Sequence, residues 1–202
     1  DTAVGRASLA WYVVAYSASL AGIALAFYYY DQALTGFALL LAAALYFLSA
    51  WALRFDVWLI PGGLALPLGL LVLLDFWGMP WAQQSAVLAA TAASYLLGGV
   101  WLEERHGVAR GFMASLYAVA HLVAGVAVFW GLAPVLEHVF GDLPWPDTAR
   151  LWAAAGQLVL GPAYGLFAWF HGRRAWAHTA AWLGVMAGGL VATAYSQGRG
   201  SS

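Results

Sequence analysis

The stretch Ala33–Leu53, ALTGFALLLAAALYFLSAWAL, is followed after only three residues by Val57–Leu74, VWLIPGGLALPLGLLVLL. Neither stretch contains a charged residue. About 20 apolar residues in helical conformation cross the hydrocarbon core of a bilayer, and backbone groups in lipid must be hydrogen-bonded within their own segment. The two stretches therefore predict a pair of transmembrane helices joined by a short turn.

The composition of the whole chain agrees with lipid as its solvent. Of 202 residues, 64% are hydrophobic and 8% are charged, whereas soluble domains carry about 25% charged residues. The eight basic residues are all arginines, and there is no cysteine. This excludes lysine Schiff bases, disulfides, thiolate metal sites and cysteine nucleophiles. The net charge of −1 gives no indication of a nucleic-acid partner, so the expected partners are membrane lipids and other transmembrane helices of the same or a partner chain.

Further stretches of the same kind predict an all-α, polytopic transmembrane helical bundle with about seven spans. Aspartate, glycine and proline lie in the gaps between them, and tryptophan and tyrosine cluster near their ends, as amphipathic rings do at the headgroup level. The predicted spans are Ala7–Tyr30, Ala33–Leu53, Val57–Leu74, Ala82–Leu102, Gly111–Ala133, Leu151–Phe170 and Ala175–Tyr195.

The distribution of arginines predicts an orientation. Short loops rich in arginine stay in the cytoplasm. Six arginines fall on the side of the N-terminus and only Arg150 and Arg199 on the other, so we expect the N-terminus inside and the C-terminus outside. The six are Arg6, Arg54, Arg105, Arg110, Arg173 and Arg174.

Two parts of the chain resemble each other. At a constant offset of 118 residues, five positions between Tyr46 and Trp58 are identical to their counterparts between Tyr164 and Trp176. The preceding spans match at an offset of 103, where Ala21-Gly22-Ile23-Ala24 resembles Ala124-Gly125-Val126-Ala127. This pattern predicts a parallel repeat of four-helix units.

The repeat sets the expected domain organisation. The first four-helix unit would cover residues 1–107, and a second unit with three helices, lacking its last, would cover residues 108–202. A longer outer loop at 134–147 would distinguish the second unit. We therefore expect a fragment of a larger polytopic membrane protein, with a complete seven-helix protein as the alternative.

Polar residues at membrane depth are the main functional candidates, because they are costly there. His121 lies near the middle of the fifth span and Gln157 in the first half of the sixth. His121 is expected to form an interhelical hydrogen bond with Gln157 or a serine. A proton relay or transport role, and ligation of haem or a pigment, are the alternatives. No metal-binding spacing is present.

Three further sets of residues are expected to have roles. The charged segment Glu103-Glu104-Arg105-His106 predicts a solvated turn after the fourth span. Small residues one helical turn apart allow helices to approach closely, and such pairs occur at Gly161 and Gly165 and at Gly184 and Gly188. The outer loop is the expected place for binding outside the lipid, through Glu137, His138, Asp142 and Trp145.

No catalytic motif or cofactor motif occurs, so an enzyme is not favoured. The leading prediction is a non-catalytic scaffold or assembly module. The alternatives are a transporter or permease fragment with a midplane site near His121 and Gln157, and a haem- or pigment-carrying membrane subunit. No diagnostic motif assigns the chain to a family, and the expected location is a bacterial inner (cytoplasmic) membrane.

Overall fold

The computed structural model describes residues 22, 31–141 and 147–198, with side chains left out at 134–141, 147 and 195–198. These residues form helices and no strand. Six of the helices are long and apolar enough to cross a membrane, the pattern of an integral membrane protein. The first predicted span, Ala7–Tyr30, lies outside the described residues except for Gly22, which is helical.

Contacts divide the chain into two compact units, residues 1–78 and 79–202. In the first, α2 (Gln32–Leu53) packs against α3 (Leu59–Phe76), with the short 3-10 helix η1 (Asp56–Trp58) between them. The Asp31 side chain caps α2 by accepting a hydrogen bond of 2.9 Å from the Leu34 amide. Arg54 ends α2 in the left-handed conformation, with φ of 53°.

Glycines allow α2 and α3 to approach each other closely. A Cβ atom at Gly62 would lie 3.0 Å from Tyr46 Cβ and 3.4 Å from the Ala43 carbonyl oxygen. At the other end of the hairpin, a Cβ at Gly36 would lie 2.5 Å from Leu73 Cγ. Tyr46 stacks on Trp58 with ring centroids 5.7 Å apart. In lipid, where apolar area alone gives little drive for association, such close packing holds helices together.

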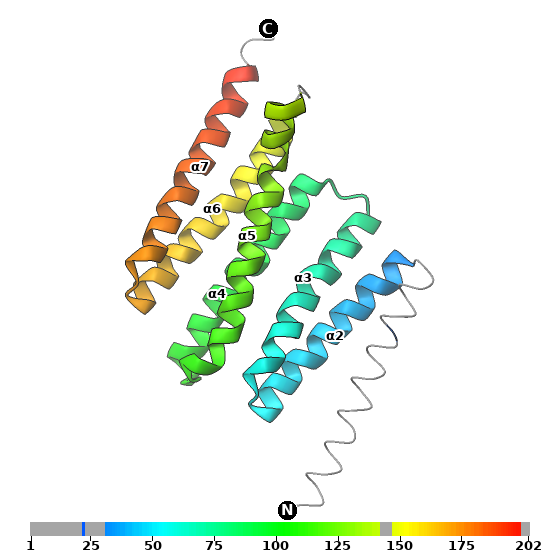
Figure 1. Ribbon diagram of the computed structural model, residues 1–202, viewed down its shortest axis with the longest axis vertical. Helices are drawn as coiled ribbons and strands as arrows, with labels where there is room; N and C mark the ends of the chain where they lie inside the picture. The colour runs from blue at the N-terminus through cyan, green and yellow to red at the C-terminus, as the bar shows by residue number, and fades with distance from the viewer. Residues whose placement is uncertain (1–21, 23–30, 142–146, 199–202) are drawn as a thin grey trace, which may run out of the picture. The chain divides into compact units, whose positions relative to one another are not determined.

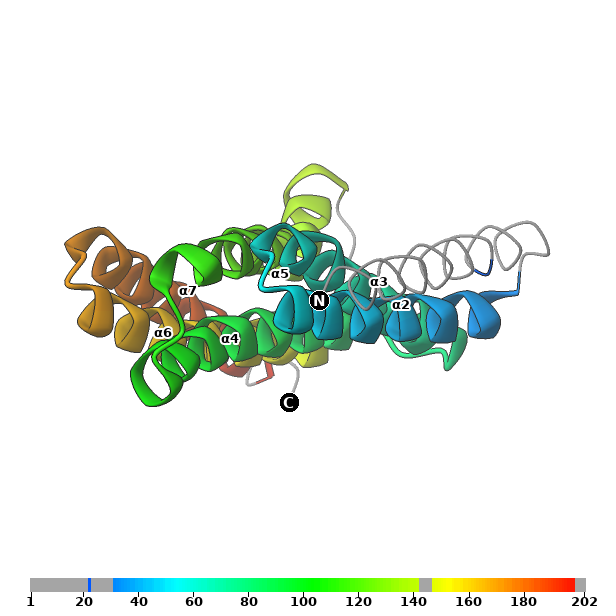
Figure 2. The ribbon, with the colours of Figure 1, turned by 90° about the horizontal axis from the view of Figure 1, so that it is seen from below.

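The second unit contains four long helices: α4 (Trp81–His106), α5 (Arg110–Gly141), α6 (Asp147–His171) and α7 (Arg174–Gly198). Helix α6 is central, since it packs against α4, α5 and α7, and α4 packs against α5. Both ribbon views show α6 next to α4 and α7 (Figures 1 and 2). Gly107 ends α4 with φ of 61°, and Gly172 makes the turn from α6 to α7 with φ of 64°.

The contact division differs from the predicted boundary at residue 107. Helix α4 packs on α5 and α6, so by contacts it belongs with the helices that follow it. The predicted boundary came from sequence similarity, which these contacts do not test. A second difference concerns the expected outer loop at 134–147. Helix α5 continues through Pro134 to Gly141, so of the expected loop residues only 142–146 lie outside the described backbone.

Candidate functional site

Helix α6 carries a polar or aromatic-polar residue at every seventh position; three of the four are buried, and the fourth, His171, is half-buried. The exposed fraction is 3% for Arg150, 2% for Gln157 and 5% for Tyr164, and 8% for the side chain of His171. A step of seven residues returns to within about 20° of the same helix face. The row runs from Arg150 to His171, which is about 31 Å of helix, close to the ~30 Å thickness of a hydrocarbon core.

At the His171 end of the row, Glu103 connects three helices. Its carboxylate accepts a hydrogen bond of 3.0 Å from the Tyr117 hydroxyl on α5, and Oε2 lies 3.4 Å from Arg110 Nε and 3.5 Å from His171 Nε2. His171 Nδ1 is 3.2 Å from the Phe167 carbonyl oxygen. Because a carbonyl can only accept, Nδ1 carries a proton, and Nε2 carries one only when the ring is charged.

The prediction of a solvated turn at Glu103–His106 holds for Glu104, Arg105 and His106, which are exposed, but not for Glu103. These residues form the last turn of α4, and the Glu103 side chain is 10% exposed. Glu103 finds its hydrogen-bond donors, Tyr117 and Arg110, on α5 instead of in water. Gly99, one turn before Glu103, makes this possible: a Cβ there would overlap the Tyr117 ring.

In the next layer of the row, His121 on α5 contacts Tyr164 on α6. Nδ1 of His121 and the Tyr164 hydroxyl share a hydrogen bond of 2.9 Å. A second neighbour is Trp176 on α7, whose ring stacks on the imidazole at a centroid distance of 4.1 Å and an interplanar angle of 11°. His121 therefore joins three helices. Its hydrogen-bond partner is a tyrosine, whereas Gln157 or a serine was expected.

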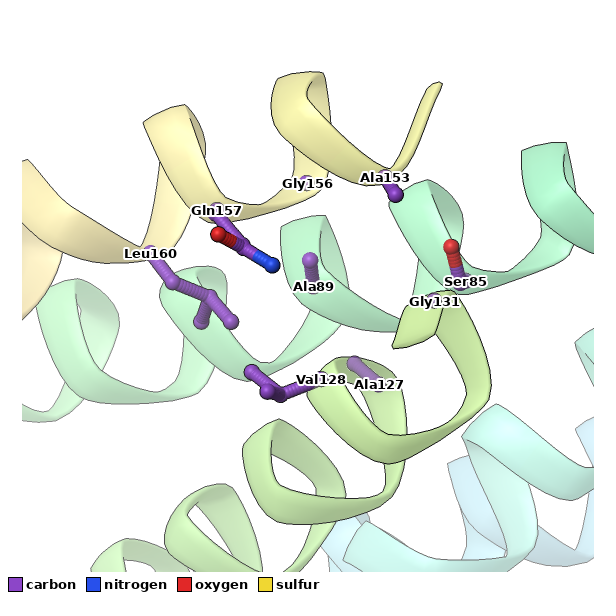
Figure 3. Close-up of a pocket in the computed structure, with 9 residues that line it drawn as sticks. All are labelled: Ser85, Ala89, Ala127, Val128, Gly131, Ala153, Gly156, Gln157 and Leu160. Atoms are coloured by element: carbon purple, nitrogen blue, oxygen red, sulfur yellow. The ribbon is translucent and has the colours of Figure 1, made fainter. Parts of the chain in front are cut away.

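Gln157 is the exception in the row. Among the described residues, neither its amide oxygen nor its amide nitrogen has a hydrogen-bond partner. Its side chain extends from α6 into a small cavity between α4, α5 and α6 (Figure 3). The volume of the cavity that the centre of a water molecule can occupy is about 10 Å³, which is room for roughly one water molecule. Its lining is mostly small: Ser85, Ala89, Ala127, Val128, Gly131, Ala153, Gly156, Gln157 and Leu160.

The row ends at Arg150, whose Nη1 donates a hydrogen bond of 3.3 Å to the Thr193 carbonyl oxygen on α7. Between the polar layers lie apolar groups. Phe167 stacks on His171 at 4.3 Å and meets the His121 ring edge-on at 5.6 Å, and Leu160 lies between Gln157 and Tyr164 along α6. The polar contacts at His171, Tyr164 and Arg150 are thus separate from one another, and each joins α6 to at least one other helix.

The predicted glycine pairs differ in their surroundings. A Cβ at Gly161 would lie 3.6 Å from the Ala180 carbonyl oxygen, and one at Gly165 would lie 4.0 Å from Ala180 Cβ. Both glycines therefore face α7. Gly184 and Gly188 lie on an exposed face of α7, and no described atom comes within 4 Å of a Cβ built there.

The residues expected in the outer loop are only partly described. Glu137 and His138 belong to the helical backbone of α5, without described side chains, and Asp142 and Trp145 lie outside the described residues. Over the described part of the chain, no group of three or more histidine, aspartate or glutamate side chains gathers as a metal site would require.

Sequence reasoning missed the row as a whole, although its signal is present: residues 150, 157, 164 and 171 are polar at a constant spacing of seven. Tyr164 was noted only as part of the repeat, and Arg150 only for its charge. No protein-family model, curated protein or solved structure matches this chain.

Proposed function

We propose that this chain is a non-catalytic helical assembly module of a bacterial inner membrane, in which buried polar contacts fix how its helices pack. The observation that carries the proposal is the polar row of α6. Two of its four members hydrogen-bond to other helices, Tyr164 to His121 on α5 and Arg150 to the Thr193 carbonyl on α7. A third, His171, has its Nε2 3.5 Å from Glu103 Oε2 on α4. Polar contacts of this kind select one register where apolar packing alone would allow several.

The proposal includes the internal repeat, as a repeated helix hairpin. Tyr46 stacks on Trp58 at 5.7 Å within the α2–α3 hairpin, and their counterparts at the offset of 118 residues, Tyr164 and Trp176, stack at 5.6 Å within α6–α7. The turns correspond as well. Arg54 and Gly172, also separated by 118 residues, both have positive φ, 53° and 64°.

Close contacts between the paired helices follow the same offset. Gly62 approaches the Ala43 carbonyl in the first hairpin, and Gly161 approaches the Ala180 carbonyl in the second. At the offset of 118 residues, Ala43 corresponds to Gly161 and Gly62 corresponds to Ala180. Both positions therefore hold a small residue in each hairpin, although the glycine and the alanine are on opposite helices in the two copies. These equivalences support copies of one hairpin on which an assembly of transmembrane helices can be built.

The His121–Tyr164 contact provides the test of the packing role. In a double-mutant cycle, Tyr164→Phe removes the hydroxyl and His121→Phe keeps a ring against Trp176. We expect a coupling free energy of about 0.6–1.7 kcal/mol, the range for hydrogen bonds between transmembrane helices. The measurement is reversible unfolding of the full chain in detergent. Gln157→Leu is the matched control, because Gln157 has no described partner to lose. A coupling of zero would contradict the packing role.

Gln157 favours a second candidate, a permease with a polar site near the membrane midplane. A buried amide facing a cavity can bind water or a small polar solute, and transporters place such groups at the midplane. The test is flux through the full chain reconstituted in liposomes. Flux of protons or a small polar solute that Gln157→Leu abolishes and Tyr164→Phe retains would establish the permease and displace the assembly module.

A further inference from the structure

Four of the eight arginines of the chain lie at one end of the second unit. Arg105 is in the last turn of α4, Arg110 begins α5, Arg173 lies in the α6–α7 turn and Arg174 begins α7. The contacts of Glu103 with Arg110 and His171 bring the ends of α4, α5 and α6 together. All four arginines are exposed. We call these four residues the arginine end.

Acidic groups do not neutralise the arginine end. Of the two acids in this region, Glu103 is engaged with Tyr117 and Arg110 and is 10% exposed on its side chain, so Glu104 is the only exposed one among the described residues there. No described acid forms an ion pair with Arg105, Arg173 or Arg174. Two helices begin and two end here, so helix dipoles largely cancel and the arginine charges decide the local potential.

Exposed aromatic rings adjoin the arginine end. Trp169 and Phe170 occupy the last turn of α6 and are 79% and 47% exposed, and Trp101 on α4 is 55% exposed. Trp169 stacks on Phe170 at a centroid distance of 6.1 Å. Tryptophan side chains of this kind lie at the level of lipid headgroups. The surface therefore presents guanidinium groups with apolar rings next to them, which matches a molecule with an anionic head and an apolar tail.

We propose that the arginine end binds the phosphate headgroup of an anionic phospholipid, whose acyl chains lie along Trp169 and Phe170. Arginine suits this ligand because its planar fork donates two parallel hydrogen bonds to a phosphodiester. Arg173 and Arg174 are the principal contacts, since they are adjacent in one turn and have no ion pair with a described residue. The aromatic rings select a lipid over free inorganic phosphate, which has no apolar part. The site exists under either candidate function.

Native mass spectrometry of the full chain in detergent tests this inference, with added phosphatidylglycerol or phosphatidylcholine. A basic residue near an anionic membrane contributes about 1 kcal/mol, or roughly fivefold in affinity. The variant with both R173Q and R174Q should therefore lose phosphatidylglycerol affinity about thirtyfold. R173K with R174K should lose less, because the charge remains while the fork is absent. The control R199Q removes a charge predicted to lie on the opposite side of the membrane and should change nothing.

Each other outcome would overturn the inference. Equal binding of phosphatidylglycerol and phosphatidylcholine to the unmodified chain would show that the arginine end does not select anionic lipid. Equal losses in the double variant and in R199Q would show that net charge, not this site, sets affinity. Displacement of the lipid by millimolar inorganic phosphate would identify a free-anion site. Circular dichroism of each variant in phosphatidylcholine confirms that it is folded.

Discussion

Replacing Gly99 by alanine should destabilise the second unit, while the same change at the adjacent Gly98 should not. Both glycines lie in the interior of α4. A Cβ at Gly99 would overlap the ring of Tyr117, with Tyr117 Cζ at 2.9 Å and the hydroxyl at 3.0 Å, whereas nothing lies within 4 Å of a Cβ at Gly98. The pair thus separates the effect of close helix packing from the effect of removing a glycine.

The expected magnitude follows from two opposing contributions. Gly→Ala in a helix interior gains up to about 1 kcal/mol in helix propensity, at either position. At Gly99 the added methyl must displace Tyr117, and overpacking of this kind costs about 1–3 kcal/mol. If the ring leaves altogether, its hydrogen bond to Glu103 is lost as well, which costs a similar amount. G99A should therefore be about 1–3 kcal/mol less stable than G98A.

The assay is reversible unfolding in mixed micelles, followed by circular dichroism. Repeating the comparison in a variant that lacks the Tyr117 ring tests the cause of the difference. With Tyr117→Ala the ring is absent, and G99A should then cost no more than G98A. Equal stability of G99A and G98A in the unmodified chain would refute the packing of Tyr117 on α4, and with it the contact between Tyr117 and Glu103.

Two further predictions concern helix ends. Asp31→Ala removes the side chain that caps α2 at the Leu34 amide, and should destabilise the first unit by about 1 kcal/mol in the same unfolding assay; an unchanged free energy of unfolding would exclude the cap. At the two corresponding turns, both positions have positive φ, which favours glycine. R54G should therefore raise the free energy of unfolding of the first unit, and G172A should lower that of the second unit, each by about 1 kcal/mol. Changes of the same sign at both positions would contradict the shared turn geometry.

The membrane helices were predictable because apolar length alone determines them. The predicted span Ala33–Leu53 became α2, Gln32–Leu53, and Leu151–Phe170 lies inside α6, Asp147–His171. The ends of the helices were harder to predict from the sequence. Pro134 does not end α5, although proline removes a backbone hydrogen bond inside a helix.

The contacts of the polar residues were less accessible from sequence. That His121 lies at membrane depth follows from its position, but its partner depends on which helix lies beside α5. In the sequence Tyr164 stands out only as part of the repeat, although its hydroxyl lies 2.9 Å from Nδ1 of His121. The charged neighbours of Glu103 in the sequence predict exposure to solvent, because the sequence does not show that Tyr117 on another helix donates a hydrogen bond to it. The spacing of seven along α6 identifies which side chains share a face, yet only tertiary packing shows that this face is buried.

Thiol labelling of single cysteines tests most directly whether these helices cross a membrane. The chain has no cysteine of its own, so each introduced thiol is unique. A membrane-impermeant maleimide applied to sealed vesicles of either orientation should reach A109C and R173C, in the α4–α5 and α6–α7 turns, from the cytoplasmic side. It should reach M79C, between α3 and α4, from the opposite side alone. Labelling of M79C from the same side as A109C would contradict a membrane-spanning α4.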